Sequence, residues 1–575
     1  MAAFYLLRHD GSSEADRLSR EIRNSLRRQG FGTPVLHRGP DCEIGAVASI
    51  GKSTDCQLLS IDRKAVAVVG TIFYGQLSGS DAMRQLTLDV ASDTIDWPSL
   101  WGCFAMVIAT PDRTILATDR VGTCHLYHDS NYRAFSTSFL AIAEAIPRRT
   151  INQTAVYDYV VQGAPHGGTV LNEVQLFDSG TVVEMSHDRR ISYRPFPSIA
   201  ADETMSLDVA ARRCIEVLRS RFQVLANGFG NNISLGLSGG FDSRLILSLL
   251  LSQGVQPRLH VYGGGDSADV GIAKEVANHR KLEIEHIDKS AFPIVAPVAF
   301  SSTVARNYDQ SDAYPTDGIF NSGADLITRQ HTCANGELML NGGGGEIFRD
   351  FFHLPLGAVA ASEIVRRFYC QFDPAICTGR FALRDYVADL ATRINESLCV
   401  RDGKLSRPLA EAAYAFFRCR FWMGRNNSLN NRFGSALTPF VDPLIVQSAL
   451  AVPAQLRCNG RLQARMISLA LSDIASIRSI YGPGFDLMPS WRFRLHEYVL
   501  RHRPIVLQSA WYRLKQRRVP TTPWPIDQQH VRALLGQRCD YMNEFFNVSA
   551  VRDPGQLNRM YTLEYLFRRV EASSP

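Results

Sequence analysis

The sequence predicts an α/β protein with two unlike parts, and three patterns support this prediction. Residues 1 to about 196 are rich in strand-like runs, which favours an α+β or sandwich domain. Residues 235–287 alternate apolar strands with helical stretches, which is typical of a parallel sheet, and residues 408–450 look helical. At 575 residues, the chain is long enough for two or three domains.

Composition excludes several classes of protein. A hydrophobic content of 45% with 21% charged residues suits a globular protein, and a net charge of +6 does not indicate nucleic-acid binding. The twelve cysteines form no Cys-x-x-Cys pair, as expected for core thiols in a reducing compartment. The apolar run after Met1 is too short for a signal peptide, and no run approaches a membrane span. We expect a cytoplasmic protein without a nucleic-acid or membrane partner.

Strand-like runs organise the first part. Residues 65–74 form a β-type run, and residues 103–109 are expected to pair with residues 114–118 across the turn at 110–113. Residues 181–185 are a further candidate strand.

A segment rich in Pro and small residues then predicts a linker at 195–204, which divides the chain into domains 1–197 and 205–575. Apolar residues at helical spacing predict an amphipathic helix over 206–226. We interpret its apolar face as core.

Three elements continue the parallel sheet. Residues 258–263 read as a strand, residues 269–279 as its partner helix and residues 282–287 as the next strand. Ligands of such sheets bind at the carboxyl ends of the strands.

The stretch 235–244 is the centre of the sequence, because an apolar strand runs into Ser-Gly-Gly-Phe-Asp-Ser and then into a helix. Glycines, the hydroxyls of Ser238 and Ser243 and the amides that begin a helix suit an anion. Asp242 would repel a bare phosphate but suits Mg²⁺ shared with phosphate oxygens. The alternative is an ordinary Gly-rich turn. The expected phosphate-binding residues are Leu237, Ser238, Gly239, Gly240, Asp242 and Ser243.

This motif lacks the Gly-Lys-Ser/Thr of a phosphate-transferring P-loop and resembles the pyrophosphate-binding loop of the ATP pyrophosphatase superfamily. Those enzymes cleave ATP between the α and β phosphates. The resemblance implies adenylation with release of pyrophosphate.

A second apolar strand, residues 338–340, ends in a Gly-rich loop that carries Glu346. Four consecutive glycines indicate that a ligand or another part of the chain comes very close. The alternative is a flexible surface loop, which the apolar flanks make less favourable. The segment also resembles the Ser-Gly-Glu-Gly-Ser-Asp-Glu stretch of synthetases in the same superfamily, and this resemblance implies Asn341, Gly342 and Gly343 as nucleotide-binding residues.

The first part resembles the amidotransferase domain of class B asparagine synthetases. The resemblance rests on Gly102-Cys103-Phe104-Ala105, residues 117–122, Leu126-Tyr127 and residues 135–138. It implies an Ntn-type sandwich followed by a larger synthetase domain with a parallel sheet and a helical C-terminal part. In that family an N-terminal cysteine hydrolyses glutamine, whereas this chain has Ala2 after Met1. We therefore expect no glutaminase activity.

In the synthetase half, the resemblance implies ATP as substrate and Mg²⁺ as cofactor, with Asp242 and Glu346 as catalytic residues and metal ligands. It places Tyr262 against the adenine, although a strand tyrosine is equally well explained as part of the sheet. Residues 436–443 resemble the family's Arg-x-Pro-Phe-Leu-Asp segment. The family usually has an acidic residue four places before the proline, and this chain has Ser435 there. Gly482 occupies the position at which the family has its catalytic lysine. The acceptor end therefore departs from the family while the ATP end keeps its pattern.

The predicted function is ATP-dependent amide-bond formation through an acyl-adenylate. Relatives without the glutaminase cysteine include β-lactam synthetases and lasso-peptide cyclases (macrolactam synthetases). We favour a cyclase that joins a peptide's N-terminal amine to an Asp or Glu side chain, with a leader-peptide-processing protein as partner. The alternatives are an asparagine synthetase that uses ammonia, a β-lactam synthetase acting on a small carboxylate, and a non-catalytic nucleotide- or peptide-binding scaffold.

A basic stretch runs from Arg492 to Arg518 with eight Lys or Arg residues. Such a run is typical of a solvated helix face, and a binding site for an acidic peptide or for phosphates is the alternative.

We also expect that neutralising Asp242 or Glu346 leaves folding intact, since the two like charges repel each other.

Overall fold

The computed structural model describes residues 2–8, 12–39, 41–50, 58–61, 63–185, 189–192, 200–293, 295–333, 336–401, 403–505, 512, 528–536 and 538–574. Arg513, Lys515, Arg517 and Arg518 of the basic stretch, and residues 195–199 of the expected linker, lie outside the described residues.

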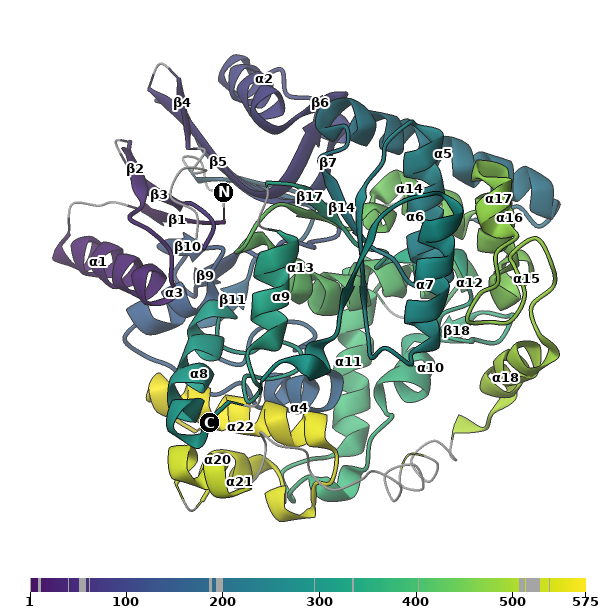
Figure 1. Ribbon diagram of the computed structural model, residues 1–575. Coiled ribbons are helices and arrows are strands. Elements are labelled where there is room, and N and C mark those ends of the chain that lie inside the picture. Colours follow the sequence, from purple (N-terminus) through teal and green to yellow (C-terminus); the bar gives the residue numbers. More distant parts are fainter. Residues whose placement is uncertain are drawn as a thin grey trace.

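The N-terminal half contains two mainly antiparallel sheets (Figure 1). The first has the order β11-β9-β10-β1-β3-β2, and the second has the order β13-β12-β8-β7-β5-β4 with β6 paired to β5. The strands of the first sheet are β1 (Ala3–Arg8), β2 (Val35–Arg38), β3 (Cys42–Val47), β9 (Tyr127–Asp129), β10 (Ala134–Ser136) and β11 (Val174–Leu176). Those of the second are β4 (Leu59–Ile61), β5 (Lys64–Tyr74), β6 (Leu77–Ser78), β7 (Leu100–Ala109), β8 (Thr114–Thr118), β12 (Thr181–Glu184) and β13 (Arg189–Ser192).

The expected hairpin is present. Strands β7 and β8 pair antiparallel from Ala105↔Thr118 to Ala109↔Thr114. The Thr110 amide donates to the Arg113 carbonyl oxygen at 2.7 Å and closes the turn.

Alternating side chains bury both faces of these strands and create four layers, helix–sheet–sheet–helix. Phe4 and Leu6 of β1 pack with Val69 of β5 between the two sheets. Tyr5 and Leu7 face the opposite way, toward the helical layer of α1 and α3. The other face of β5 and β7 packs on α2. The helices of this half are α1 (Ser13–Arg28), α2 (Gly79–Ser92), η1 (Trp97–Ser99), α3 (Phe139–Ala145) and α4 (Gln153–Gln162). The expected sandwich is confirmed.

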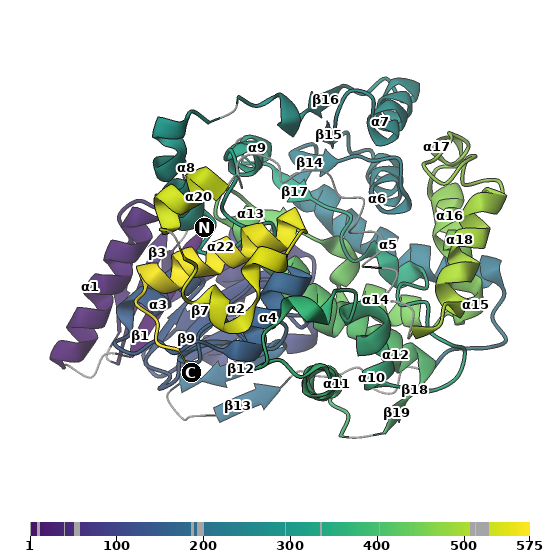
Figure 2. The ribbon, with the colours of Figure 1, turned by 90° about the horizontal axis from the view of Figure 1, so that it is seen from below.

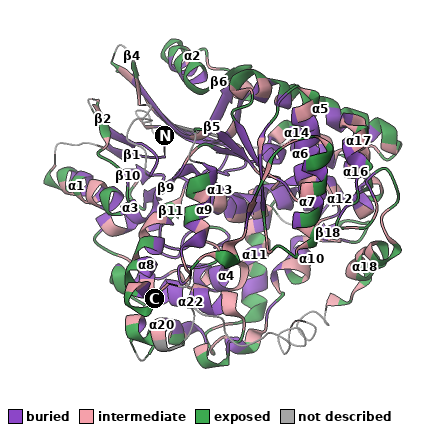
Figure 3. Cartoon of the chain, in the orientation of Figure 1, coloured by how far each residue is buried: buried purple, intermediate pink, exposed green. Residues whose placement is uncertain are grey.

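A five-stranded parallel sheet forms the centre of the second half, in the order β16-β15-β14-β17-β20 (Figure 2). Its strands are β14 (Ile233–Gly236), β15 (Arg258–Tyr262), β16 (Ile284–Ile287), β17 (Leu338–Leu340) and β20 (Ala436–Leu437). Leu235 of β14 is in register with Leu340 of β17, so the loops that follow these two strands emerge side by side. The interiors of β14, β15 and β17 are buried, whereas the edge strand β16 exposes Glu285. Figure 3 colours the described residues by burial.

Helices surround this sheet and continue to the C-terminus. The amphipathic helix expected at 206–226 is α5, which contacts α6, α14 and α16. These and the following helices are α5 (Leu207–Phe229), α6 (Phe241–Ser252), α7 (Ala268–His279), η3 (Lys289–Ala291), α8 (Pro297–Gln310), α9 (Ala324–Thr332), η4 (Gly345–Phe348), α10 (Ala361–Ile364), η5 (Val365–Tyr369), η6 (Pro374–Ile376), α11 (Leu383–Ser397), α12 (Arg407–Ala413), η7 (Tyr414–Met423), α13 (Gly424–Asn431), η8 (Pro439–Val441), α14 (Pro443–Leu450), α15 (Ala454–Arg457), η9 (Cys458–Gly460), α16 (Arg461–Ala470), α17 (Ser472–Ala475), α18 (Trp491–His502), α20 (Gln528–Leu535), α21 (Met542–Phe545), η11 (Val548–Ala550) and α22 (Pro554–Arg569).

Two further features connect distant segments. A small sheet pairs β18 (Val359–Ala360) with β19 (Lys404–Leu405), and α22 returns to pack on α4 of the first half (Figure 1). Within the described residues, no helix combines the length and the apolar composition needed to cross a bilayer.

Candidate active site

The Ser-Gly-Gly loop connects the central strand β14 to α6, as its sequence predicts. The Ser238 amide donates to Ser243 Oγ at 2.9 Å, and the two serine hydroxyls lie 3.0 Å apart. The Gly239 amide donates to Asp269 Oδ1 at 2.8 Å. The loop is therefore held in shape by its own hydroxyls, while one of its amides is bonded to an acid at the start of α7.

Asp242 lies in the first turn of α6 and accepts two hydrogen bonds. Arg349 Nη2 donates to Oδ2 at 2.7 Å, and Gln463 Nε2 donates to Oδ1 at 2.7 Å. Burial raises the pKa of Asp242 to about 6, the guanidinium of Arg349 opposes this rise, and the nearby Glu346 carboxylate adds to it.

Glu346 approaches the same guanidinium from η4, after strand β17. Its Oε1 lies 3.7 Å from Arg349 Nη2, and its Oε2 accepts a hydrogen bond from the Tyr414 hydroxyl. The two acids singled out in the sequence are thus brought together by adjacent strands. A guanidinium lies between them and holds their like charges near each other.

Two glycines of the second loop, Gly342 and Gly345, are explained by the position of Asp242. A Cβ on Gly345 would lie 2.1 Å from Asp242 Oδ1, and one on Gly342 would lie 2.8 Å from Asp242 Cβ. Asn341 Oδ1 accepts from the Gly343 amide at 3.0 Å and so fixes the start of the loop. The close approach expected from the four glycines is that of Asp242 at these two positions, of Met423 at Gly343 and of Val441 at Gly344.

The two carboxylates fit Mg²⁺ in their chemistry, because this ion prefers oxygen ligands and commonly takes one or two carboxylates together with substrate phosphates. Among the described residues, no group of three or more His, Cys, Asp or Glu side chains could hold a metal by itself. A site of this kind would therefore be completed by phosphate oxygens. Arg349 pairs with both acids in the structure and would have to share them with the ion.

A cavity of about 520 Å³ opens beside these residues. Seven of the expected site residues line it: Ser238, Asp242, Ser243, Asn341, Gly342, Gly343 and Glu346. Its remaining walls come from Gly236, Thr316, Asp317, Arg329, Phe351, Tyr414, Arg418, Cys419, Trp422, Met423, Asn426 and Asn430. Leu237, Gly239, Gly240 and Tyr262 are not part of the lining. Tyr262 is 39% exposed, and Lys289 Nζ lies 4.8 Å from its ring centroid.

Ser435 and Gly482 are two positions at which the sequence departs from the pattern that it resembles. Ser435 is exposed and does not line the cavity. Gly482 has a φ of +120°, and a Cβ there would lie 3.0 Å from Ser490 Cβ, so a lysine would be strained. The preceding Tyr481 stacks on Phe241, with ring centroids 4.6 Å apart, and accepts a hydrogen bond from Arg349.

Sequence reasoning missed Arg349, Gln463, Tyr414 and Arg418. Arg349 follows Glu346 by three residues, and this short spacing was the one available signal. The other three come from helices far along the chain, and nothing in their local sequence marks them.

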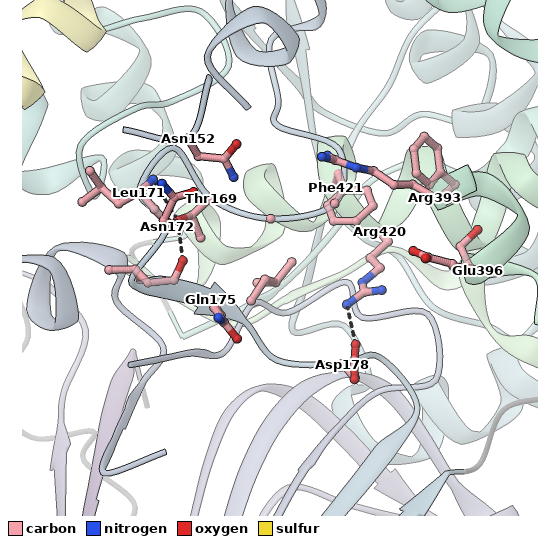
Figure 4. A pocket seen from close by; sticks show the side chains of 16 residues that line it. Asn152, Thr169, Leu171, Asn172, Gln175, Asp178, Arg393, Glu396, Arg420 and Phe421 are labelled. Carbon is pink, nitrogen blue, oxygen red and sulfur yellow. Dashed lines mark hydrogen bonds and ion pairs between the residues drawn. The ribbon is translucent and has the colours of Figure 1, made fainter. Parts of the chain in front are cut away.

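A second cavity, of about 380 Å³, lies where the two halves meet (Figure 4). Asn152, Asn172 and Asp178 of the first half face Arg393 and Arg420 of the second. Its charged groups are largely paired: Arg393 lies 3.0 Å from Asp389, and Arg420 lies 3.8 Å from Asp178. We therefore place the candidate active site in the first cavity.

Asp158, close to this second cavity, predicts a pH effect on stability. Burial raises its pKa to about 7, although Arg393 lies 3.8 Å away. As pH rises from about 4 to 7, the unfolded carboxyl releases its proton and the folded one keeps it, so the free energy of unfolding falls. The loss is at most about 1.4 kcal/mol per pH unit. Asp158→Asn should remove this component in denaturant melts at pH 5 and pH 7. Equal pH dependence in both proteins would contradict the assignment.

Comparison with known proteins gives weak similarities. No protein-family model and no curated protein sequence matches the chain. A solved structure described as the allosteric regulatory enzyme of purine biosynthesis is 12% identical, covers 51% of this chain and 82% of its own, and has a TM-score of 0.21. Glutamine phosphoribosylpyrophosphate amidotransferase from B. subtilis, solved with ADP and GMP, gives the same identity and coverage with a TM-score of 0.22. At this level, the similarity assigns no family or activity.

Proposed function

We propose that the chain is an ATP-dependent amide ligase that forms AMP and pyrophosphate. The observation that carries the proposal is the convergence of Asp242 and Glu346 on one cavity, beside a Ser-Gly-Gly loop at the carboxyl end of the parallel sheet. Nucleotides bind at this edge of doubly wound sheets. A volume of about 520 Å³ lies within the range of small-molecule sites.

The residues of the site support distinct tasks. The hydroxyls of Ser238 and Ser243 and the amides in the first turn of α6 would bind the β and γ phosphates. Burial disfavours the charged form of Arg349, but the neighbouring Asp242 and Glu346 carboxylates raise its pKa above the ordinary value. Arg349 therefore stays cationic and can neutralise the departing pyrophosphate. Mg²⁺ bound by Asp242 and Glu346 would supply further charge neutralisation. The remaining walls would hold the acid so that its carboxylate faces the α phosphate.

We infer further that the amine belongs to the same substrate, so that the reaction closes a macrolactam in a peptide. The support is the absence of a nucleophile at Ala2, which lies buried beside β1 with its amide bonded to the Val47 carbonyl oxygen. An amide ligase that uses free ammonia, or a β-lactam synthetase acting on a small carboxylate, would satisfy the same observation.

One observation favours a second candidate, a nucleotide- or peptide-binding scaffold without activity. Protein groups already engage both carboxylates, since Asp242 pairs with Arg349 and Gln463 while Glu346 pairs with Arg349 and Tyr414. In a scaffold these contacts would be permanent.

The activity is tested by incubating peptides that contain Asp or Glu with the protein, ATP and Mg²⁺. We expect a product lighter than its peptide by one water, detected by mass spectrometry and dependent on ATP. Binding of ATP without turnover of any peptide or small acid would favour the scaffold.

A further inference from the structure

The π-helix η7 forms one wall of the candidate active site. Its i→i+5 hydrogen bonding widens each turn, so residues four and five apart share a face. One face lines the active-site cavity, and the opposite face lines the second cavity. The first face consists of Tyr414, Arg418, Cys419, Trp422 and Met423, and the second of Phe417, Arg420 and Phe421. π-helical turns occur frequently at functional sites.

Arg418 lies in this wall and forms no ion pair with any residue that the structure describes. Its guanidinium lies 4.7 Å from the ring centroid of Phe368, 5.0 Å from that of Trp422 and 5.8 Å from that of Phe351. Among the described residues, it takes part in no hydrogen bond or ion pair.

The other arginines of this region are paired. Arg329, which also lines the cavity, lies 2.6 Å from Asp325, and the neighbouring Arg349 lies 2.7 Å from Asp242. Within the part of the chain that the structure describes, Arg418 is therefore the arginine of this cavity wall without an ion pair. The aromatic rings hold the Arg418 guanidinium by cation–π contact, which leaves its N–H donors available at the edge.

We propose that Arg418 binds a carboxylate of the acyl substrate, one that is not itself adenylated. This inference rests on the proposed function and adds that the substrate carries a second acidic group. A planar guanidinium matches a carboxylate with two parallel hydrogen bonds. The phosphates would be bound by other donors, namely Ser238, Ser243 and the start of α6. Arg418 is therefore left to bind a carboxylate.

The test measures binding, using glutarate as a phosphate-free probe with two carboxylates. Glutarate is titrated calorimetrically into protein saturated with Mg²⁺ and α,β-methylene-ATP, which cannot be cut at the α–β bond. We expect Arg418→Met to raise the Kd for glutarate by about 10- to 100-fold. Arg418→Lys, which keeps the charge and loses the fork, should fall between. Arg212→Met is the matched control, because Arg212 is exposed on α5 and should leave the Kd unchanged.

Pyrophosphate titrations distinguish the two sources of anionic oxygen. The Kd for pyrophosphate should stay the same in Arg418→Met. An unchanged glutarate Kd, no glutarate binding by the wild-type protein, or a selective loss of pyrophosphate binding would overturn the proposal. If Arg418→Met fails to fold, Arg418→Lys and Arg418→Gln provide the comparison. The binding test does not depend on turnover. If the wild-type protein forms no AMP but binds glutarate, and Arg418→Met loses this binding, the ligase proposal is refuted and the carboxylate subsite is retained.

Discussion

Replacing Asp242 by Asn is expected to slow pyrophosphate release by about 10²- to 10³-fold, because the charge that organises cations around the leaving group is lost. Glu346→Gln should act similarly through the same cluster. Since both acids share Arg349, the double variant should be less impaired than the product of the two single effects. Single-turnover release at saturating Mg²⁺ measures all three rates. Near-normal turnover in either single variant would exclude that residue from the chemistry.

The structure changes the expectation that these substitutions leave folding intact. Arg349 separates the two acids, so removing one charge leaves a largely buried guanidinium with a single anionic partner. We now expect Asp242→Asn to lower the free energy of unfolding by about 1–3 kcal/mol. Denaturant melts without nucleotide measure this loss. An unchanged melt would show that Arg349 finds other partners.

The second large effect is expected from Gly345→Ala. The new Cβ would lie 2.1 Å from Asp242 Oδ1, so the carboxylate must move away from its position. A displacement of about 1 Å can reduce turnover about 10²-fold when it affects a positioned catalytic group. The rate of pyrophosphate release is the measurement.

Gly357→Ala is the matched control for this variant. Nothing lies within 4 Å of the Cβ built at Gly357, and its φ is not in the left-handed region. Both substitutions restrict the unfolded chain alike. Equal activity in the two variants would show that the Gly-rich loop does not constrain Asp242.

Local patterns in the sequence were sufficient for much of the fold. The hairpin of β7 and β8 followed from two apolar runs around a Pro-Asp turn, and the β14–α6 connection followed from a short apolar strand before Ser-Gly-Gly. The meeting of Asp242 and Glu346 could be anticipated, because parallel strands place their carboxyl ends at one edge.

The rest of the site depends on long-range packing. Gln463 is 221 residues from the aspartate it contacts, and Tyr414 is 68 residues from Glu346. Neither has a local pattern that would mark it. Tyr262 shows the opposite limit, since its strand was correctly expected but the structure leaves its side chain outside the cavity.

The most direct test of the central claim follows the phosphorus atoms of ATP during substrate-dependent turnover. With label on the α phosphate, we expect it in AMP, and with label on the γ phosphate, we expect it in pyrophosphate, in equal amounts. Formation of ADP, with the γ label in inorganic phosphate, would contradict the assignment of the Ser238–Ser243 loop as a pyrophosphate-binding loop.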